Sequence, residues 1–540
     1  MASYNGAQLV ARSLKDLGVE VIFGLVAASY AATAYGYLTG RPGVCLVVGG
    51  PGVLHAMAGS SETHLVTKGA FQELDAISLL HPHTKIAVRS TLDSISHSIR
   101  TAYRTSWYGR PGTGFIDLPA DVIQGEGEYT PTQIVTSAPR PAGDPVIIQK
   151  VVQLIKSAKA PLVIVGKGAA YAQAESIIRQ LINQTNIPFL PTPMGKGVLP
   201  DSHSSNTATS RSAALKGADM ILVLGARLNW ILHYGEAPKY NENVKIIQVD
   251  TSAEEIGKNN GDAELGIIGD INVVTRQLTE ALHGWKYDTS SQYMKTLKQV
   301  DKVPMTYGKV FDVIKETIHK LSPPKEGGIV YVSEGANTMD ISRSAFPVEH
   351  PRLRLDAGTH ATMGVGLGYA IAAHCYLFRR RFCFRVLSAE VETMARYGMD
   401  ILIFVINNGG VYQGDSESSD AWLKLQKKSE AGSRGGLRST SLGWEVGYEK
   451  VAEMCGGKGY LVHTPDELAI ATEEGFKASV PVIVNVIIEA GAQKTLEFAW
   501  QQDSKRSSNK AKFKGTSVDT FEKSFLFCRL LTIQDANPGS

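Results

Sequence analysis

Short runs of apolar residues, several of them rich in Val and Ile, recur along the chain between stretches with helical spacing or many glycines. Uniformly apolar runs of this length are typical of strands that are buried on both faces of a parallel sheet. Their alternation with helical patterns predicts an α/β protein. The pattern predicts strands over 19–26, 43–48, 113–118, 162–165, 220–224, 244–249, 328–333, 382–387, 401–406 and 482–488.

These runs divide into three groups. Prolines at positions 131, 139, 141 and 145 mark a linker after the first group, and a helix over 304–324 marks a second boundary. We therefore expect three doubly wound parallel-sheet domains, at 1–130, 145–300 and 305–500. The first is expected to be truncated, because residues 59–77 are polar where a further strand would normally come. Residues 501–540, which are polar and basic over 504–512, are expected to be a disordered tail.

Composition narrows the class of protein. A chain of 540 residues is too long for a single core, and 43% hydrophobic with 20% charged residues is ordinary for a globular protein. A net charge of +3 gives no reason to expect nucleic acid as a partner. The five cysteines are scattered, so neither a disulfide framework nor a cysteine metal site is expected. No secretory signal and no apolar run of membrane-spanning length is visible, and no membrane partner is expected.

The run over 401–406 ends in Asn407-Asn408-Gly409-Gly410. In open α/β sheets, ligands bind at the carboxyl ends of the strands. Amide oxygens there can coordinate a hard cation, and glycines let phosphates and backbone carbonyls approach closely. An ordinary turn is the alternative, since Asn-Gly is a common turn signal.

Glycine turns also follow the strands of the middle group, and two polar residues accompany them. Lys167 lies between Gly166 and Gly168, and Asp250 ends the strand 244–249. The lysine could meet a phosphate and the aspartate could accept a ribose hydroxyl. A solvated lysine and a helix cap are the alternatives.

Four motifs carry a resemblance to known enzymes: 36–45 (GYLTGRPGVC), 333–341 (SEGANTMDI), 355–359 (LDAGT) and 411–414 (VYQG). Together with the Asn-Asn-Gly-Gly strand end, they resemble the thiamine-diphosphate-dependent decarboxylases and lyases, and among these the 2-hydroxyacyl-CoA lyase family. The oxalyl-CoA decarboxylases are the near relatives and the alternative. The likeness runs from about Gly6 to Trp500.

The resemblance implies a carbon–carbon lyase that cleaves a 2-hydroxyacyl-CoA to formyl-CoA and an aldehyde, with thiamine diphosphate and Mg²⁺ as cofactors. It also implies a homodimer or homotetramer and a peroxisomal or cytoplasmic location, although the last residues 538–540 are not a peroxisomal signal. The implied site residues are Tyr412, Phe71 and Gln72 for catalysis, Asn337, Thr362, Met363, Asn408 and Gly410 for the cofactor, Asn408 and Gly410 for the metal, and Lys167 and Asp250 for coenzyme A. A core methionine is the alternative for Met363, and an exposed helix start for Phe71 and Gln72.

Two departures from the family pattern stand out. The turn that supplies the metal-binding aspartate is absent from 384–393, and no glutamate lies between Glu20 and Glu62, where the family has the residue that activates the cofactor. Each departure removes a whole segment, and so does the shortened stretch before Phe71. The second hypothesis is therefore a catalytically impaired homologue, or a chain assembled without some coding segments, that keeps only part of the ligand binding.

Overall fold

The computed structural model describes residues 3–24, 28–47, 62–68, 70, 73–298, 306–357, 362, 364–378, 389–409, 424 and 446–488. The account below concerns these residues. The predicted strand over 382–387 and the predicted tail over 501–540 lie outside them. None of the described helices combines the length and the apolar character needed to cross a membrane.

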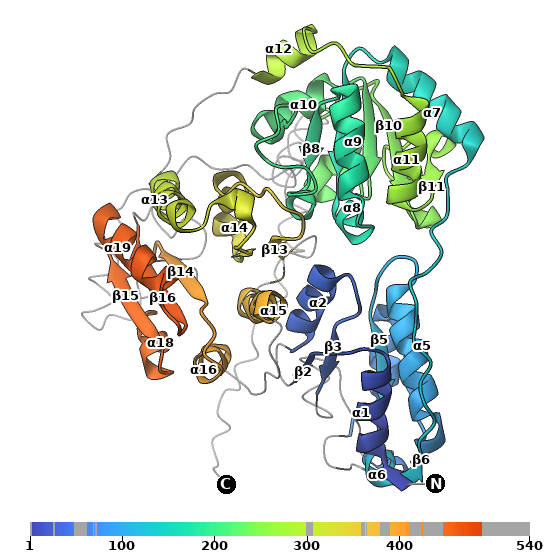
Figure 1. Cartoon of the computed structure of the whole chain (residues 1–540), viewed down its shortest axis with the longest axis vertical. Helices are drawn as coiled ribbons and strands as arrows, with labels where there is room; N and C mark the ends of the chain where they lie inside the picture. The colour runs from blue at the N-terminus through green and yellow to red at the C-terminus, as the bar shows by residue number, and fades with distance from the viewer. Residues whose placement is uncertain are drawn as a thin grey trace, which may run out of the picture. The chain divides into compact units, whose positions relative to one another are not determined.

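The middle of the chain forms a parallel sheet of five strands (Figure 1). Their order is β11-β10-β9-β7-β8, so the winding direction reverses between β7 and β9. This is a doubly wound sheet, as expected, with its topological switch point between those two strands. The apolar runs form strands because their side chains are buried on both faces. The strands are β7 (Pro161–Val165), β8 (Phe189–Pro191), β9 (Met220–Leu224), β10 (Lys245–Asp250) and β11 (Ile267–Ile268).

Helices with one apolar stripe cover this sheet, and α9 packs beside α11 (Figure 1). The side chain of Asp144 caps α7 by accepting from the backbone of Val146, and Asp270 caps α11 in the same way. The helices are α7 (Pro145–Ser157), α8 (Lys167–Tyr171), α9 (Glu175–Thr185), α10 (Arg211–Gly217), α11 (Ile271–Ala281) and α12 (Gln292–Lys298).

The strands before the proline linker pair only two by two within the described ranges. Strand β1 (Ser3–Asn5) pairs antiparallel with β6 (Glu126–Glu128). The other two pairs are parallel: β2 (Ile22–Gly24) with β3 (Val44–Leu46), and β4 (Ile86–Arg89) with β5 (Gly114–Asp117). The helices are α1 (Gly6–Asp16), α2 (Ala28–Thr39), α4 (Ala76–Leu80), α5 (Ile95–Trp107) and α6 (Ala120–Gln124). The expected strand over 19–26 is three residues long here.

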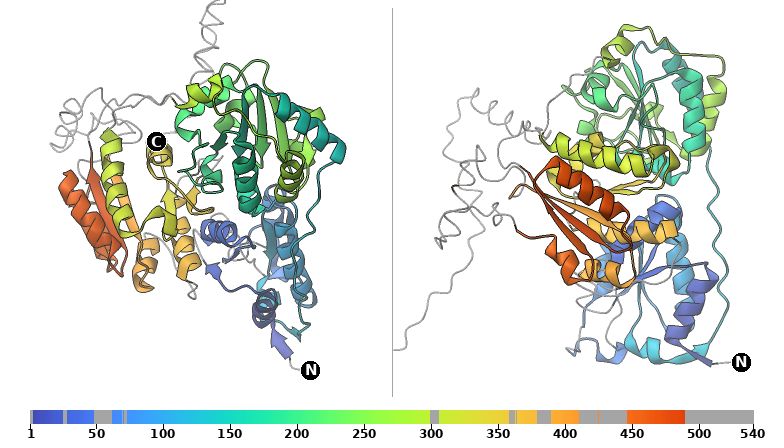
Figure 2. Two further views of the ribbon diagram at one scale, coloured as in Figure 1. Left: turned by 45° about the horizontal axis from the view of Figure 1, so that its top comes forward. Right: turned by 60° about the vertical axis from the view of Figure 1, so that its left-hand side comes forward.

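The last part of the chain contains two parallel sheets, β12-β13 and β14-β16-β15 (Figure 2). The strands are β12 (Tyr331–Ser333), β13 (Arg354–Asp356), β14 (Leu402–Asn407), β15 (Lys458–Val462) and β16 (Val482–Ile487). The helices are α13 (Thr306–Leu321), α14 (Ala336–Ala345), α15 (Gly366–Phe378), α16 (Ala389–Arg396), α18 (Lys450–Met454) and α19 (Pro465–Phe476). Helix α13 packs against α19.

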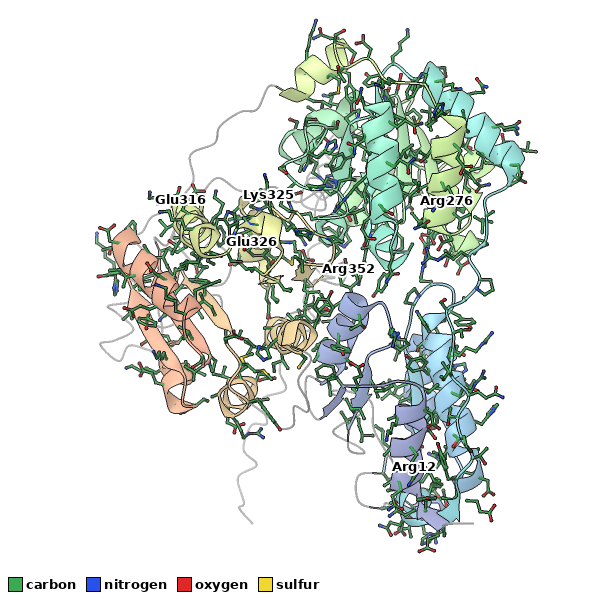
Figure 3. All side chains as sticks on the ribbon, in the orientation of Figure 1. Arg12, Arg276, Glu316, Lys325, Glu326 and Arg352 are labelled. Carbon is green, nitrogen blue, oxygen red and sulfur yellow. The ribbon has the colours of Figure 1, made fainter. Side chains whose placement is uncertain are left out.

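Several contacts join these three parts of the chain. Helices α2 and α15, both largely apolar, pack against each other. The hydroxyl of Tyr37 donates to the carbonyl of Met194 at 2.9 Å. Arg352, labelled in Figure 3, donates to the carbonyl of Ala170 at 3.0 Å and to the carboxylate of Glu175 at 2.5 Å.

Candidate functional site

The strand end predicted to bind the cofactor forms an ordered turn. Asn407 ends β14 and is buried, and its side-chain oxygen accepts from the backbone N–H of Gly409 at 3.0 Å. Gly409 has φ +71°, a conformation that favours glycine. Asn407 therefore shapes the turn, and the buried Asn408 follows it.

A second asparagine fixes Asn407 from the neighbouring strand. Asn485 on β16 is fully buried, and its side-chain oxygen accepts from the amide of Asn407 at 3.3 Å. Its own amide donates to the carboxylate of Glu449 at 2.8 Å and to the carbonyl of Val446 at 2.9 Å. A buried polar chain with its members satisfied makes this end of the sheet rigid.

Glu334 links the loops that follow β12 and β13. One oxygen of its carboxylate accepts from the backbone N–H of Gly366, the first residue of α15, at 2.6 Å, and the other accepts from Gly364. Apart from their chain neighbours, no atoms of the described residues lie within 4 Å of where a Cβ on Gly335 (φ +81°) or Gly364 (φ +82°) would be. The strand ends thus combine left-handed glycines with open space, which suits the close approach of a phosphate.

Two arginines surround the end of β13. Arg343 and Arg354 lie 3.1 and 3.8 Å from the carboxylate of Asp356, which is fully buried. Arg354 also donates to the hydroxyls of Ser333 at 2.7 Å and Ser342 at 2.9 Å. Burial lowers the pKa of Arg354 to about 10, although Asp356 opposes that shift.

The carboxylates near these strand ends are therefore committed within the protein. Asp356 pairs with arginines, Glu334 holds two backbone N–H groups, and Glu449 accepts from Asn485. Across the part of the chain that the structure describes, no three acidic, histidine or cysteine side chains come together as metal ligands. Amide and backbone groups here fit a diphosphate, whereas Asp356, Glu334 and Glu449 already have partners within the protein.

Asp250 lies at the carboxyl end of β10, where it meets an arginine from the first part of the chain. Its carboxylate accepts from Arg110 at 3.3 Å and from the backbone of Ser252 at 2.9 Å. Arg110 also donates to Glu255 at 3.0 Å. Although burial opposes it, hydrogen bonding to Glu255 and the charge of Asp250 raise the pKa of Arg110. A ligand at Asp250 would therefore also meet a guanidinium.

Lys167 lies beside two tyrosine rings. Its ammonium nitrogen is 5.1 Å from the ring centroid of Tyr37 on α2 and 5.1 Å from that of Tyr171 on α8. Burial raises the pKa of the Tyr37 hydroxyl. The cation stabilises the contact between these rings, a role that the sequence did not suggest.

The glycines around Lys167 are explained by packing at the switch point. The N–H of Gly168 donates to the carbonyl of Gly225 at 2.9 Å, and a Cβ on either Gly166 or Gly168 would overlap the backbone of Gly225. The loops after β7 and β9 are thus in direct backbone contact. These glycines allow one loop to approach another, whatever ligand they also meet.

A half-buried arginine lies at the start of α10. Arg211 donates to the carbonyl of Ile231 at 2.5 Å, and it forms no ion pair with a carboxylate among the described residues. Burial, with the nearby charge of Arg343, lowers the pKa of Arg211. Binding of an anion beside this half-buried guanidinium would stabilise its charge.

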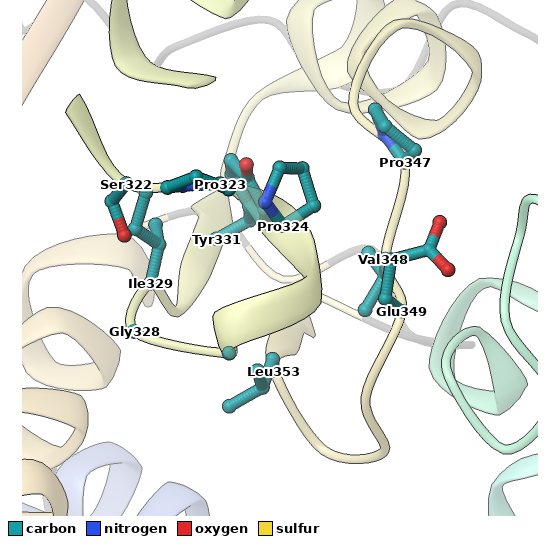
Figure 4. Close-up of a pocket in the computed structure, with 11 residues that line it drawn as sticks. Ser322, Pro323, Pro324, Gly328, Ile329, Tyr331, Pro347, Val348, Glu349 and Leu353 are labelled. Carbon is teal, nitrogen blue, oxygen red and sulfur yellow. The ribbon is translucent and has the colours of Figure 1, made fainter. Parts of the chain in front are cut away.

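Figure 4 shows a small pocket before β12. Its free volume is about 10 Å³, room for roughly one water molecule. It is lined by Ser322, Pro323, Pro324, Gly327, Gly328, Ile329, Tyr331, Pro347, Val348, Glu349 and Leu353. None of the predicted site residues is among them.

The structure places only part of the predicted site. Asn408, Lys167 and Asp250 are described as above, Thr362 is half-buried two residues before Gly364, and for Asn337 the backbone alone is described, in the first turn of α14. The predicted residues outside the described ranges are Phe71, Gln72, Met363, Gly410 and Tyr412. Sequence reasoning missed Glu334, Arg110 and Arg211, because no local pattern marks a side chain whose partners lie far away in the sequence.

Comparison with known proteins identifies the three parts. Residues 26–66 match the N-terminal TPP binding domain of thiamine pyrophosphate enzymes, 148–278 the central domain, and 334–486 the C-terminal TPP binding domain. The chain belongs to the thiamine pyrophosphate enzyme family. The expected three-domain α/β fold is confirmed, and so is the shortness of the first domain.

Two named groups of relatives match along most of the chain. It is 39% identical to 2-hydroxyacyl-CoA lyase 1 of Homo sapiens, over 92% of this chain and 96% of that protein. It is 38% identical to 2-hydroxyacyl-CoA lyase of Arabidopsis thaliana, over 91% and 97%. With oxalyl-CoA decarboxylase of Escherichia coli (strain K12) the identity is 30%, over 90% and 95%. The resemblance inferred from the motifs is confirmed at the level of the family.

The comparison with the human protein also shows that this chain lacks internal segments of that relative. The alignment spans 570 positions, whereas 92% of 540 residues is about 497 residues. About 73 aligned positions (570 less 497) are therefore filled in the relative and empty in this chain. Internal segments of the relative have no counterpart here.

Proposed function

We propose that this protein is a thiamine-diphosphate-dependent lyase that cleaves 2-hydroxyacyl-CoA thioesters. The observation that carries the proposal is the strand-end arrangement around Asn407, Asn408 and Glu334, in a chain 39% identical to a 2-hydroxyacyl-CoA lyase. The lower identity to oxalyl-CoA decarboxylase, 30%, makes decarboxylation of oxalyl-CoA the alternative reaction.

In this reaction the bond between the hydroxyl-bearing carbon and the thioester carbonyl carbon breaks. The hydroxyl loses its proton as the aldehyde forms, and one proton is returned to the thioester carbon to give formyl-CoA. Thiamine diphosphate, when bound, supplies the electron sink that makes the cleavage possible.

The described residues support the binding half of this proposal. We assign the diphosphate to the turns at Gly335, Gly364 and Gly409, which share a left-handed backbone, and the first two leave room for close approach. We assign the metal contact to the side-chain amide oxygen of Asn408, the position that the family pattern indicates for a Mg²⁺ ligand.

We propose that attraction between cationic side chains and the phosphates of coenzyme A contributes to binding of the acyl-CoA. Coenzyme A carries several phosphate charges, and Arg211, Arg110 and Lys167 are the cations that the structure suggests for them. Asp250 is the proposed acceptor for a ribose hydroxyl. The family's homodimer or homotetramer remains part of the proposal, as does the acyl-CoA partner.

A second candidate is an impaired homologue that binds ligands without turnover. Three observations favour it: about 73 aligned positions are empty in this chain, residues 21–61 contain no glutamate, and the carboxylates near the strand ends are committed elsewhere. Without an acidic ligand, a metal-bound diphosphate loses a charged contact that an amide does not replace.

Calorimetry and product assay separate these candidates. The chain is titrated with thiamine diphosphate in the presence and absence of Mg²⁺, and aldehyde release from a 2-hydroxyacyl-CoA is measured beside CO₂ release from oxalyl-CoA. Asn408→Ala serves as the site variant and exposed Asn243→Ala as its control. Aldehyde release that Asn408→Ala abolishes supports the lyase. Cofactor or acyl-CoA binding without product supports the impaired homologue, whose activity should return when the missing segments are restored from a relative.

A further inference from the structure

Glu334, which follows β12, joins two loops that lie far apart in the sequence. It accepts from backbone groups 30 and 32 residues further along the chain, at Gly364 and Gly366. Each carboxylate oxygen takes one N–H, which fixes the plane of the group. The second of these N–H groups opens helix α15, where a negative charge is favoured by the helix dipole.

The fit between Glu334 and Gly366 is mutual. The three atoms nearest to a Cβ placed on Gly366 all belong to Glu334, and the nearest is the carboxylate oxygen that the glycine N–H meets. Gly366 does not have a positive φ, so its backbone suits alanine. Glycine is therefore needed here for the room that the glutamate occupies.

Glu334 is also held from its other side. The preceding residue, Ser333, accepts from the buried Arg354 at 2.7 Å and pairs in register with Asp356 across the two strands. The base of the glutamate is thus tied to β13, and its carboxylate to α15. A comparable carboxylate on α19 acts only locally, because Glu467 accepts from His463 and Thr464, within four residues of itself.

We propose that Glu334 is a positioning residue that sets the start of α15, and with it Thr362 and Gly364, against the glycine turn that opens α14. The inference deepens the proposed function, since both loops carry residues assigned there to the cofactor. It adds a role that the sequence motif alone did not indicate.

A double-mutant cycle tests the positioning without any cofactor. Gly366→Ala and Glu334→Ala are made singly and together, and hydrogen exchange is followed at the amide of Gly364. Gly366→Ala should raise the exchange rate at least about tenfold in the wild-type background, by displacing the carboxylate, and change it little in Glu334→Ala. Equal effects of Gly366→Ala in both backgrounds would overturn the proposal.

The cofactor arm compares Glu334→Gln with its matched control Glu467→Gln. We expect the dissociation constant of thiamine diphosphate to rise about tenfold in the first, the equivalent of one charge-assisted hydrogen bond, and to stay unchanged in the second. Equal constants in the two variants contradict a role toward the cofactor. If the wild-type chain binds no thiamine diphosphate, the proposed function fails, and the exchange cycle still decides the positioning.

Discussion

The side-chain amide of Asn407 donates to the side-chain oxygen of Asn485 at 3.3 Å, which ties the ends of β14 and β16 together inside the sheet. Since Asn485 also donates to the buried Glu449, its loss would leave a carboxylate and an amide unsatisfied. We expect Asn485→Ala to lower the free energy of unfolding by about 2–4 kcal/mol, as for a broken buried network.

Urea unfolding followed by circular dichroism measures this change. The exposed Asn243→Ala is the control and should stay within about 0.5 kcal/mol of the wild type. A loss below 1 kcal/mol in Asn485→Ala would show that the network contributes little.

Gly168 is expected to tolerate no larger side chain. A Cβ at this position overlaps backbone atoms of Gly225, and backbone cannot move as a side chain does. Gly168→Ala should therefore cost about 1–3 kcal/mol of unfolding free energy, the usual range for overpacking. Gly328→Ala is the matched control, because a Cβ there meets only the hydroxyl oxygen of Ser322. Equal melting temperatures for the two variants would contradict this reading.

His203 predicts a dependence of stability on pH. Its Nδ1 accepts from the backbone of Ser205 at 3.1 Å and its Nε2 lies 2.9 Å from the side-chain oxygen of Asn183, so the neutral ring suits both partners. Burial lowers the pKa of His203 below its ordinary value of 6.5. Below pH 6.5 the unfolded chain therefore binds a proton that the folded chain does not, and stability falls as the pH drops through the lowered pKa.

Denaturant titrations between pH 5 and pH 7.5 check this dependence. His203→Gln removes the titrating group and should flatten the slope below about pH 6.5, the ordinary histidine value. His283→Gln, at an exposed position, should leave the slope as it is in the wild type. An unchanged slope in His203→Gln would contradict the assignment.

Lys167 offers a way to separate packing from ligand binding. Lys167→Met keeps the apolar stem and removes the cation between the two tyrosine rings, so unfolding free energy should fall by roughly 1–2 kcal/mol. Lys167→Arg should retain most of it. If Lys167 also binds a phosphate of coenzyme A, calorimetry will show weaker binding of coenzyme A to Lys167→Met. Unchanged stability with weaker binding would assign the lysine to the ligand alone.

Sequence reasoning found the strands whose signal is local. The run Met220–Leu224 was expected with its observed bounds, since five consecutive apolar residues have few alternatives to a buried strand. The strands that it missed are β1, β4, β6, β8, β11, β13 and β15. Strand β13 consists of Arg354, Leu355 and Asp356, whose charges are tolerated inside only because Arg343 and Ser333 come from elsewhere in the chain.

The location of the candidate site at a strand end was predictable from the sequence, whereas the partners of its individual side chains were not. The resemblance pointed to Asn408 as the cofactor and metal ligand, but the sequence did not distinguish Asn407 as the residue that shapes the turn. That distinction depends on Asn485, 78 residues beyond Asn407. Arg110 and Asp250 are 140 residues apart, a pairing that no periodicity reports.

The five-stranded sheet of the middle domain is the largest single sheet among the described residues, and β7, β8 and β9 are buried along their whole length. The strands on either side of it in the sequence form sheets of two or three. We therefore expect local unfolding to cost less free energy outside this sheet than within it. In amide hydrogen exchange, the amides of β7 and β9 should exchange last. Limited proteolysis that cuts between residues 131 and 144 should therefore leave the middle domain intact.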